Sequence, residues 1–350
     1  MIDNIIFAKA MPQRSDIDED FVVYTVADLY RNIDGYDFSN RLDSRHKEEI
    51  ILKITDFVRI LPDSSQIYDI SFIADRDIEI LGLIDREFIE SDILRFLGND
   101  LGVSIYCESN LKYFIYTNVF NHFSLRSVVL GNGIEKVFDV IESVSILFDD
   151  YFVPTFSRSY GYITNDLATV GHGVKIRFLL NIWGLRGSSV FESVLGTLAS
   201  NGIFYHHNPL YDKTSFMEFF YVFNPDKSMI ANKILLSNLL SKVKEVELAE
   251  RKKSKGKKFN LYSEYQDFKN TIKMANFIHY KAFLGLMSKL SMLVFFGNEF
   301  GEKINLNEMI NFFTILLRDT SIMLYSGITV SNDSIIGKER ASILKKFFKL

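Results

Sequence analysis

Cysteine is almost absent from this chain, since Cys107 is the only one in 350 residues. A single cysteine excludes an internal disulfide, and the N-terminal stretch Met-Ile-Asp-Asn-Ile-Ile has neither the basic segment nor the long apolar core of a secretion signal. We therefore expect a cytoplasmic protein. We expect Cys107 to be a small buried hydrophobic residue rather than a nucleophile, because no histidine and acid form a recognisable motif with it.

An excess of positive charge is also missing. The 40 Lys and Arg residues face 44 Asp and Glu residues, which gives a formal net charge of −4. Without surplus cations the chain has little capacity to displace counterions from a phosphate backbone, so we expect no nucleic acid among its partners. The most apolar run, residues 283–296, contains Lys289 and is too short to span a bilayer. We expect a buried helix there and no membrane partner.

Hydrophobic residues are abundant, at 47%, and only 5 prolines interrupt regular structure. This composition predicts a sizeable core, in one large domain and a smaller one. Apolar spacing predicts helices at residues 43–58, 134–148, 174–183 and 190–200, and helices alone after about residue 226. It predicts short strands at 68–73, 78–83, 111–117, 125–130, 160–164, 202–205 and 216–223, with the last two paired. This order is typical of the α+β class, with an antiparallel sheet backed by helices.

A basic run at residues 251–258 interrupts the C-terminal helical pattern. Its clustered like charges favour a solvated linker, and a docking patch for a partner is the alternative. We place the boundary between a first domain, residues 1–255, and a helical C-terminal domain, residues 256–350, within this run.

The most informative segment is residues 161–175, Gly-Tyr-Ile-Thr-Asn-Asp-Leu-Ala-Thr-Val-Gly-His-Gly-Val-Lys. A tyrosine-bearing strand leads into a turn, here called the glycine turn, in which Gly171 and Gly173 allow a close approach of the backbone. We expect a helix to follow, which presents its N-terminus and Lys175 to a ligand. The segment therefore predicts a ligand-binding corner.

This segment resembles the signature of the ATP:guanido phosphotransferases, and specifically that of their bacterial protein-arginine kinase branch. The matching residues are Gly161, Tyr162, Thr164, Val170, Gly171 and Gly173, and Lys175 replaces a phosphate-binding arginine with another cation. Weaker matches extend from Phe21 to the end of the chain. The resemblance implies a large, mostly antiparallel sheet flanked by helices, as in a guanido kinase catalytic domain, followed by an all-helical C-terminal domain.

The residues that the resemblance assigns to catalysis are changed in this chain. Val26 and Asp28 stand where the family has two phosphate-binding arginines. His122 replaces a carboxylate that orients the guanidinium substrate, and Thr214 stands at the catalytic acid position of a mobile loop. Asp166 occupies the place of the reactive cysteine. The usual phosphotransfer machinery is therefore degenerate.

Cationic character remains at Arg126, Lys175 and His206, which the resemblance places in the nucleotide site. Glu87 replaces a nucleotide-contacting histidine, and Asp28 would repel phosphate at a cost of about 1 kcal/mol in water or about 4 kcal/mol at an effective dielectric constant near 20. We expect Arg126 and Lys175 to line one wall of a cleft beside the glycine turn. We expect Asp28 and Glu87 to face the same cleft. Together with the glycines, the three cationic residues form the candidate nucleotide-binding or anion-binding site.

Two further sites are considered, one for phosphoarginine and one for a metal ion. Arg340 lies on a basic C-terminal helix that resembles the part of the kinase branch that reads phosphoarginine, although an acid and a later arginine of that motif are replaced. It is the candidate phosphoarginine-binding residue. His172, His206 and His207 suggest a metal site, but adjacent histidines on a strand point to opposite faces and no acid or cysteine cluster has ligand spacing. We expect no metal.

These departures predict a protein-arginine-kinase-like pseudokinase, a noncatalytic interaction or regulatory protein that requires no cofactor. The alternative is an active ATP-dependent protein-arginine kinase with rearranged catalytic residues, which would need ATP and magnesium. A third interpretation keeps nucleotide or anion binding without transfer. The resemblance implies a protein partner, such as chaperone or protease machinery, and a homodimer.

Overall fold

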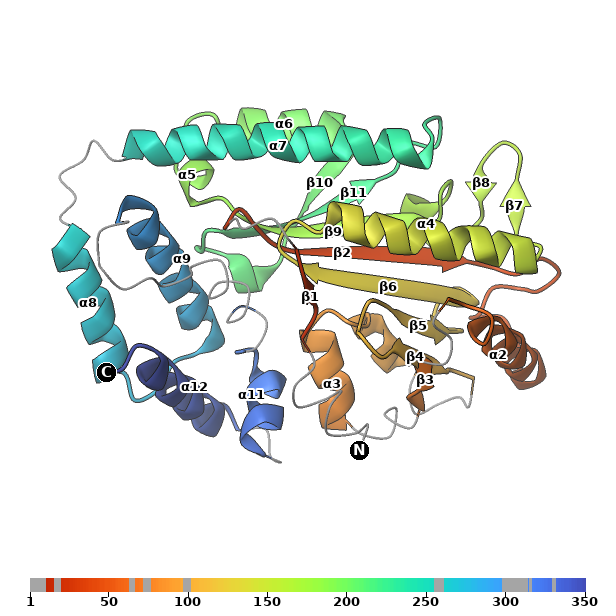
Figure 1. The fold of residues 1–350 in the computed structure, drawn as a ribbon, viewed down its shortest axis with the longest axis horizontal. Coiled ribbons are helices and arrows are strands. Elements are labelled where there is room, and N and C mark those ends of the chain that lie inside the picture. The colour runs from red at the N-terminus through yellow and green to blue at the C-terminus, as the bar shows by residue number, and fades with distance from the viewer. Residues whose placement is uncertain are drawn as a thin grey trace.

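The computed structural model describes residues 11–15, 20–62, 67–71, 77–96, 102–254, 261–297, 314, 317–328 and 332–350. Its centre is a nine-stranded sheet in the order β10-β11-β9-β2-β6-β5-β4-β3, with β1 paired to β6 (Figure 1). The β1–β6 pair is parallel and the other pairs are antiparallel. The predicted α+β class with a mostly antiparallel sheet is confirmed.

The strand that positions the rest is β2 (Val22–Arg31), which has β9 on one side and β6 on the other. All ten of its residues are buried, because strands cover both of its edges and helices cover both of its faces. The remaining strands of the sheet are β1 (Gln13–Arg14), β3 (Ile67–Asp69), β4 (Ile105–Glu108), β5 (Phe114–Thr117), β6 (Phe123–Leu130), β9 (Val174–Asn181), β10 (Ile203–His206) and β11 (Phe216–Val222). A separate hairpin consists of β7 (Phe156–Ser157) and β8 (Gly161–Tyr162).

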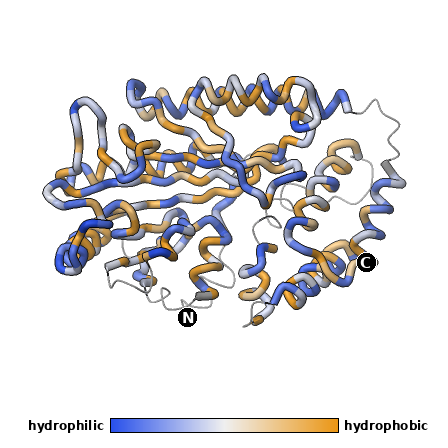
Figure 2. The backbone as a smooth tube through the Cα atoms, turned by 180° about the vertical axis from the view of Figure 1, so that it is seen from behind, coloured by the Kyte–Doolittle hydropathy of each residue, from blue (hydrophilic) through white to orange (hydrophobic). Residues whose placement is uncertain are grey.

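Two hydrophobic cores lie on the two faces of the sheet. Ala27 and Leu29 of β2 point to a core that they share with α2 (Ser44–Val58), α4 (Ile134–Tyr151), α6 (Phe191–Ser200) and α7 (Met229–Lys253). Tyr24 and Val26 point to the opposite core, shared with α3 (Asp77–Asp85), α8 (Leu261–Met274), α9 (Tyr280–Phe296), α11 (Asp319–Ser326) and α12 (Asp333–Phe347). Figure 2 shows hydrophobic stretches along the central strands, between these two layers. Shorter helical segments are η3 (Ser91–Arg95), η4 (Leu167–Thr169), α5 (Trp183–Arg186) and η5 (Pro209–Tyr211).

Several local predictions are confirmed. The side chain of Asp43 accepts a hydrogen bond from the His46 backbone N–H and caps α2. Strands β10 and β11 are antiparallel neighbours, with Tyr205 opposite Phe219. In the described residues, all regular structure after residue 226 is helical.

A separate observation concerns helix length and hydropathy: none of the described helices combines the length and apolar character that a membrane span requires.

Two segments differ from their prediction. Residues 174–183, predicted as a helix, form strand β9 and the start of α5, because Val174, Ile176 and Phe178 are buried while Lys175 and Arg177 between them are only partly buried. Val174 and Phe178 are four residues apart, and residues at this spacing share one face in a helix and also in a strand. The apolar spacing therefore did not distinguish a helix from a strand. Residues 78–83, predicted as a strand, belong to helix α3.

The predicted linker is also partly wrong. Residues 251–253 continue helix α7 to Lys253, and Arg251 is buried rather than solvated. The rest of the basic run, from residue 255, lies outside the described residues.

Candidate functional site

The glycine turn joins the β7–β8 hairpin to β9. Tyr162 and Gly171 exchange backbone N–H···O bonds of 2.8 and 3.1 Å. Gly171 and Gly173 have φ angles of 116° and 65°, and a Cβ on Gly173 would lie 2.4 Å from Arg31 Nη1 and 2.5 Å from Tyr30 O. Glycine is required at residue 173 because the end of β2 already fills the space beside it.

Arg31 occupies the space beside the glycine turn. Its Nη1 donates to Tyr30 O at 2.9 Å and to His172 O at 3.0 Å, and its guanidinium carbon lies 3.5 Å from the centre of the Tyr162 ring. No helix begins at residue 174, so the helix N-terminus expected to face a ligand does not exist at this position. The turn therefore holds the ends of β2 and β9 together through this chain's own arginine.

Asp28, Arg126 and Lys175 lie side by side across the sheet. Asp28 on β2 is paired with Arg126 on β6 and with Lys175 on β9. Paired residues of antiparallel strands point to the same face, which here is the face covered by α3 and the C-terminal helices. Arg177 lies two residues beyond Lys175 on β9 and points to this face as well.

Arg126 is held by two carboxylates. Its Nε and Nη2 donate to the two oxygens of Asp28 at 2.5 and 3.0 Å, and Nη2 also donates to Glu90 at 2.8 Å. The Tyr30 hydroxyl donates to the same carboxylate of Glu90. Asp28 is 0% exposed and Arg126 is 2% exposed. A bidentate arginine–carboxylate pair of this kind is among the strongest hydrogen-bonded contacts in proteins.

A second set of pairs continues from this one. Arg177 contacts Glu87 at 3.2 Å and Glu218 at 3.1 Å. Arg318, which precedes α11, contacts Glu87 at 3.3 Å and donates to the Tyr211 hydroxyl at 3.1 Å. The helical C-terminal part is thereby linked to the sheet. We call the following residues the ion-pair network: Asp28, Glu87, Glu90, Arg126, Arg177, Glu218 and Arg318.

The network is close to electrically balanced. Its four carboxylates face three guanidinium groups, which leaves one negative charge in excess. Burial alone would raise the pKa of Glu87, but Arg177 and Arg318 hold that pKa below its ordinary value. Burial raises the pKa of Glu90 despite its contact with Arg126. The three guanidinium groups are therefore neutralised from within the chain.

The structure differs from the predicted anion site in the environment of Arg126 and Lys175. Arg126 and Lys175 do share a face with Asp28, and Glu87 joins the same network, as expected. However, Arg126 does not line an open cleft wall, because it is buried against Asp28. The Nζ atom of Lys175 lies 5.5 Å from the centre of the Phe220 ring, which places this cation beside an aromatic side chain rather than in the network. The Nε and Nη2 donors of Arg126 already bind carboxylates, so an anion would have to compete with Asp28 and Glu90 for them.

His122, at the position of a substrate-orienting carboxylate, directly precedes β6 and packs against the loop that follows β2. Its Nδ1 accepts from the Ile33 N–H at 3.0 Å, and its Nε2 lies 2.7 Å from Asp37 O. It is 0% exposed, and burial lowers its pKa. These contacts fix a neutral ring, with Nε2 as the donor, that holds the loop.

Thr214 and Asp166, the other changed positions, also make local contacts. Thr214 Oγ1 donates to Tyr211 O at 2.7 Å, and Asp166 accepts from the Ala168 N–H at 2.9 Å to begin η4. Arg186 donates to Tyr211 O at 3.1 Å, so the loop corresponding to the mobile loop is held in place. His206 is exposed at the end of β10, opposite Glu218.

Arg340, the candidate phosphoarginine-binding residue, is buried in the fold. It is 1% exposed, and it donates to Leu317 O at 3.1 Å, to Ile278 O at 2.7 Å and to the carboxylate of Asp319. These contacts connect α12 to the segments before α9 and α11. The donors of Arg340 are thus used inside the fold, and its phosphoarginine role stays a prediction.

The last group of candidate residues is the histidine set that suggested a metal site. Within the residues that it describes, no group of three or more His, Cys, Asp or Glu side chains could hold a metal ion. His172, one member of the suggested histidine set, has its Nε2 2.8 Å from Lys227 O.

Comparisons with known proteins agree with the sheet and its helices. No family model matches the chain. The protein-arginine kinase of Clostridium acetobutylicum is 19% identical over 188 residues, which are 53% of this chain and 54% of that protein. That of Halothermothrix orenii is 22% identical over 186 residues, 53% of this chain and 52% of that protein. The chain thus spans about half the length of the curated relatives that it matches.

Solved structures of phosphagen kinases are similar in fold to this chain. The duplicated taurocyamine kinase of Schistosoma mansoni with bound transition state analog components has a TM-score of 0.57 at 17% identity, covering 67% of this chain and 34% of that chain. Lombricine kinase has a TM-score of 0.56 at 15% identity, covering 70% of this chain and 75% of that chain. The chain therefore has the fold of the phosphagen kinases, and about half of its sequence is similar to protein-arginine kinases.

Proposed function

We propose that this chain is a noncatalytic, protein-arginine-kinase-like protein that acts by interaction or regulation. One observation carries the proposal: the carboxylates of Asp28 and Glu90 occupy the donors of Arg126 that a phosphate would need. In the related kinases, the resemblance implies arginine in place of Asp28. Here the same position supplies a carboxylate, which fills the site from within.

Nucleotide binding at Arg126 would require displacement of its carboxylate partners. A triphosphate would have to separate buried ion pairs before it could contact Arg126 or Arg177. Breaking a buried pair costs about 3–5 kcal/mol, and each like-charge contact between a phosphate and a remaining carboxylate adds about 4 kcal/mol at an effective dielectric constant near 20. Phosphoryl transfer also depends on cations around the triphosphate. Lys175 alone supports neither tight nucleotide binding nor transfer.

The proposed biological role is recognition of a protein partner, with chaperone or protease machinery as the class implied by the resemblance. A homodimer and a cytoplasmic location belong to the same proposal. In this role the chain needs no cofactor, whereas ATP and magnesium would be required by an active kinase.

The catalytic part of this proposal predicts no phosphoryl transfer. Purified protein with Mg-ATP is expected to leave free arginine and protein arginine unmodified, because Val26, Asp28, His122 and Thr214 replace two arginines and two acids. The measurement is acid-labile phosphoarginine, detected by phosphorus NMR. The Clostridium acetobutylicum relative serves as the positive control.

Phosphoarginine formed by this chain would contradict the proposal. If that product also disappears in Lys175→Ala but persists in Lys242→Ala, the active-kinase alternative is correct. Lys242 is an exposed residue of α7 and provides a matched change of charge outside the sheet.

A further inference from the structure

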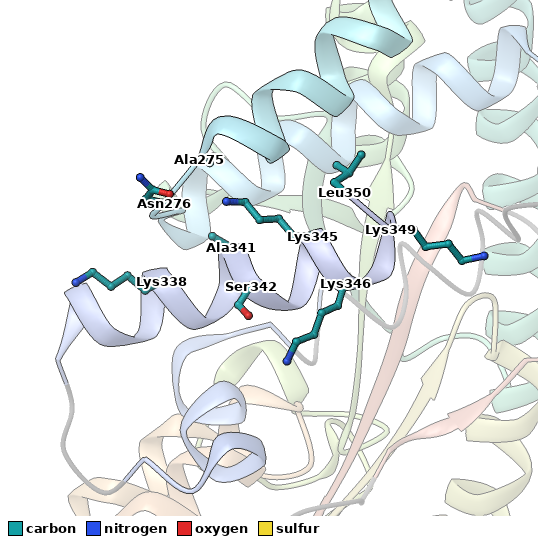
Figure 3. Close-up of a pocket in the computed structure, with 9 residues that line it drawn as sticks. All are labelled: Ala275, Asn276, Lys338, Ala341, Ser342, Lys345, Lys346, Lys349 and Leu350. Carbon is teal, nitrogen blue, oxygen red and sulfur yellow. The ribbon is translucent and has the colours of Figure 1, made fainter.

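A pocket of about 560 Å³ lies between α12 and the end of α8 (Figure 3). Four lysines of α12 and the residues after it line this pocket: Lys338, Lys345, Lys346 and Lys349. Ala341 and Ser342 lie between them on α12, and Ala275 and Asn276 close the side formed by the end of α8. We call this site the lysine pocket.

The lysine pocket is cationic and carries no balancing acid. None of its lining residues is an aspartate or glutamate. In the part of the chain that the structure describes, the four ammonium groups also make no ion pair. Lys338, Lys346 and Lys349 are exposed, and Figure 3 shows Lys345 directed toward Ala275 and Asn276. The net charge of the whole chain is −4, so this concentration of positive charge is local.

The lining residues select the chemistry of a ligand. A ligand with a guanidinium group would need a carboxylate partner, and no residue that lines the pocket is an aspartate or glutamate. Arg340, on the same helix, pairs with Asp319 and does not line the pocket. The pocket therefore suits a group that is only anionic. The small residues Ala275, Ala341 and Ser342 leave room for side-chain methylenes between the lysines.

The dimensions favour an extended acidic peptide. Lys338 and Lys346 are eight positions apart on α12, which corresponds to about 12 Å along a helix at 1.5 Å per residue. An extended chain covers that length in about four residues. A duplex nucleic acid would require a broader basic surface, and a lipid bilayer is flat whereas this site is hollowed.

We propose that the lysine pocket binds an acidic, glutamate- or aspartate-rich segment of a protein partner. The pocket is formed by α8 and α12 and does not include the ion-pair network. The inference therefore goes beyond the proposed function and holds whether or not the chain transfers phosphate.

The test uses the full chain and a fluorescein-labelled peptide of six glutamates, followed by fluorescence anisotropy. Binding is expected at about 50 mM salt and is expected to weaken at about 200 mM, because attraction between exposed charges is screened. Lys338→Glu combined with Lys345→Glu is expected to weaken binding about tenfold or more, from the loss of two attractive contacts and the gain of two repulsive ones.

The matched control is Lys242→Glu with Lys252→Glu, which makes the same change of net charge on exposed positions of α7. It is expected to change the dissociation constant by less than about twofold. Equal weakening in the two double variants would overturn the proposal, as would failure of the unmodified chain to bind the glutamate peptide. Tighter binding to phosphatidylserine vesicles or single-stranded DNA than to the peptide would also overturn it. An unchanged melting temperature in both double variants shows that the comparison is between folded proteins.

Discussion

Asp28→Ala is expected to lower the free energy of unfolding by about 3–5 kcal/mol, because it leaves the buried guanidinium of Arg126 without its bidentate partner. Glu90 would remain in contact, but one carboxylate cannot satisfy the donors that Asp28 now accepts from. Urea unfolding followed by circular dichroism measures the change.

The matched control for this prediction is Asp56→Ala. Asp56 forms an exposed ion pair with Arg59 at 2.8 Å, and its loss is expected to cost less than about 1 kcal/mol. If Asp28→Ala were no more destabilising than Asp56→Ala, the ion-pair network could not be a structural replacement for bound phosphate.

Arg251→Ala is expected to produce a loss of similar size, about 3–5 kcal/mol. Arg251 is buried on α7, where it donates to Glu247 at 2.6 Å, to both oxygens of Asp20 at 2.8 Å and to Asn181 O at 2.9 Å. Its guanidinium carbon also lies 5.0 Å from the centre of the Trp183 ring. The substitution would leave Glu247, which is 0% exposed, without its cation.

The neighbouring exposed lysine provides the comparison for Arg251. Lys252→Ala removes one positive charge from the same helix turn and is expected to change stability by no more than about 0.5 kcal/mol. Thermal unfolding of the two variants distinguishes them. A melting temperature for Arg251→Ala equal to that of Lys252→Ala would mean that this basic segment is a solvated linker after all.

The sequence predicted the elements whose signals are local. The side chain of Asp43 caps α2, and two apolar runs separated by a polar loop predicted β10 and β11 as a pair. The segment before Asn181 was misassigned because Val174 and Phe178 are spaced for either a helix or a strand. Only the neighbouring strands decide between the two, through the pairing of β9 with β2 and β11.

The sequence predicted which residues of the candidate site differ from the family, but it did not predict the ion pairs that these residues form. Asp28 and Glu87 were visible as acids in place of an arginine and a histidine. The face to which Asp28 points follows from the strand pairing, whereas Glu87 reaches the same network from the turn after α3. Arg177, Glu90 and Arg318 were not singled out, because charged residues are exposed in most proteins and nothing local marks them as buried. Arg177 would have been found with β9 read as a strand, since it lies two residues after Lys175. Arg318 is 231 positions from Glu87, and no sequence signal links them.

The central claim is that carboxylates of this chain occupy Arg126, the arginine that the resemblance places in the nucleotide site. Calorimetric titration of the unmodified protein with Mg-ATP tests it most directly. We predict no saturable binding below about 1 mM, and no preference for ATP over inorganic phosphate, because Arg126 and Arg177 are already paired. A dissociation constant in the micromolar range that depends on magnesium would contradict the claim.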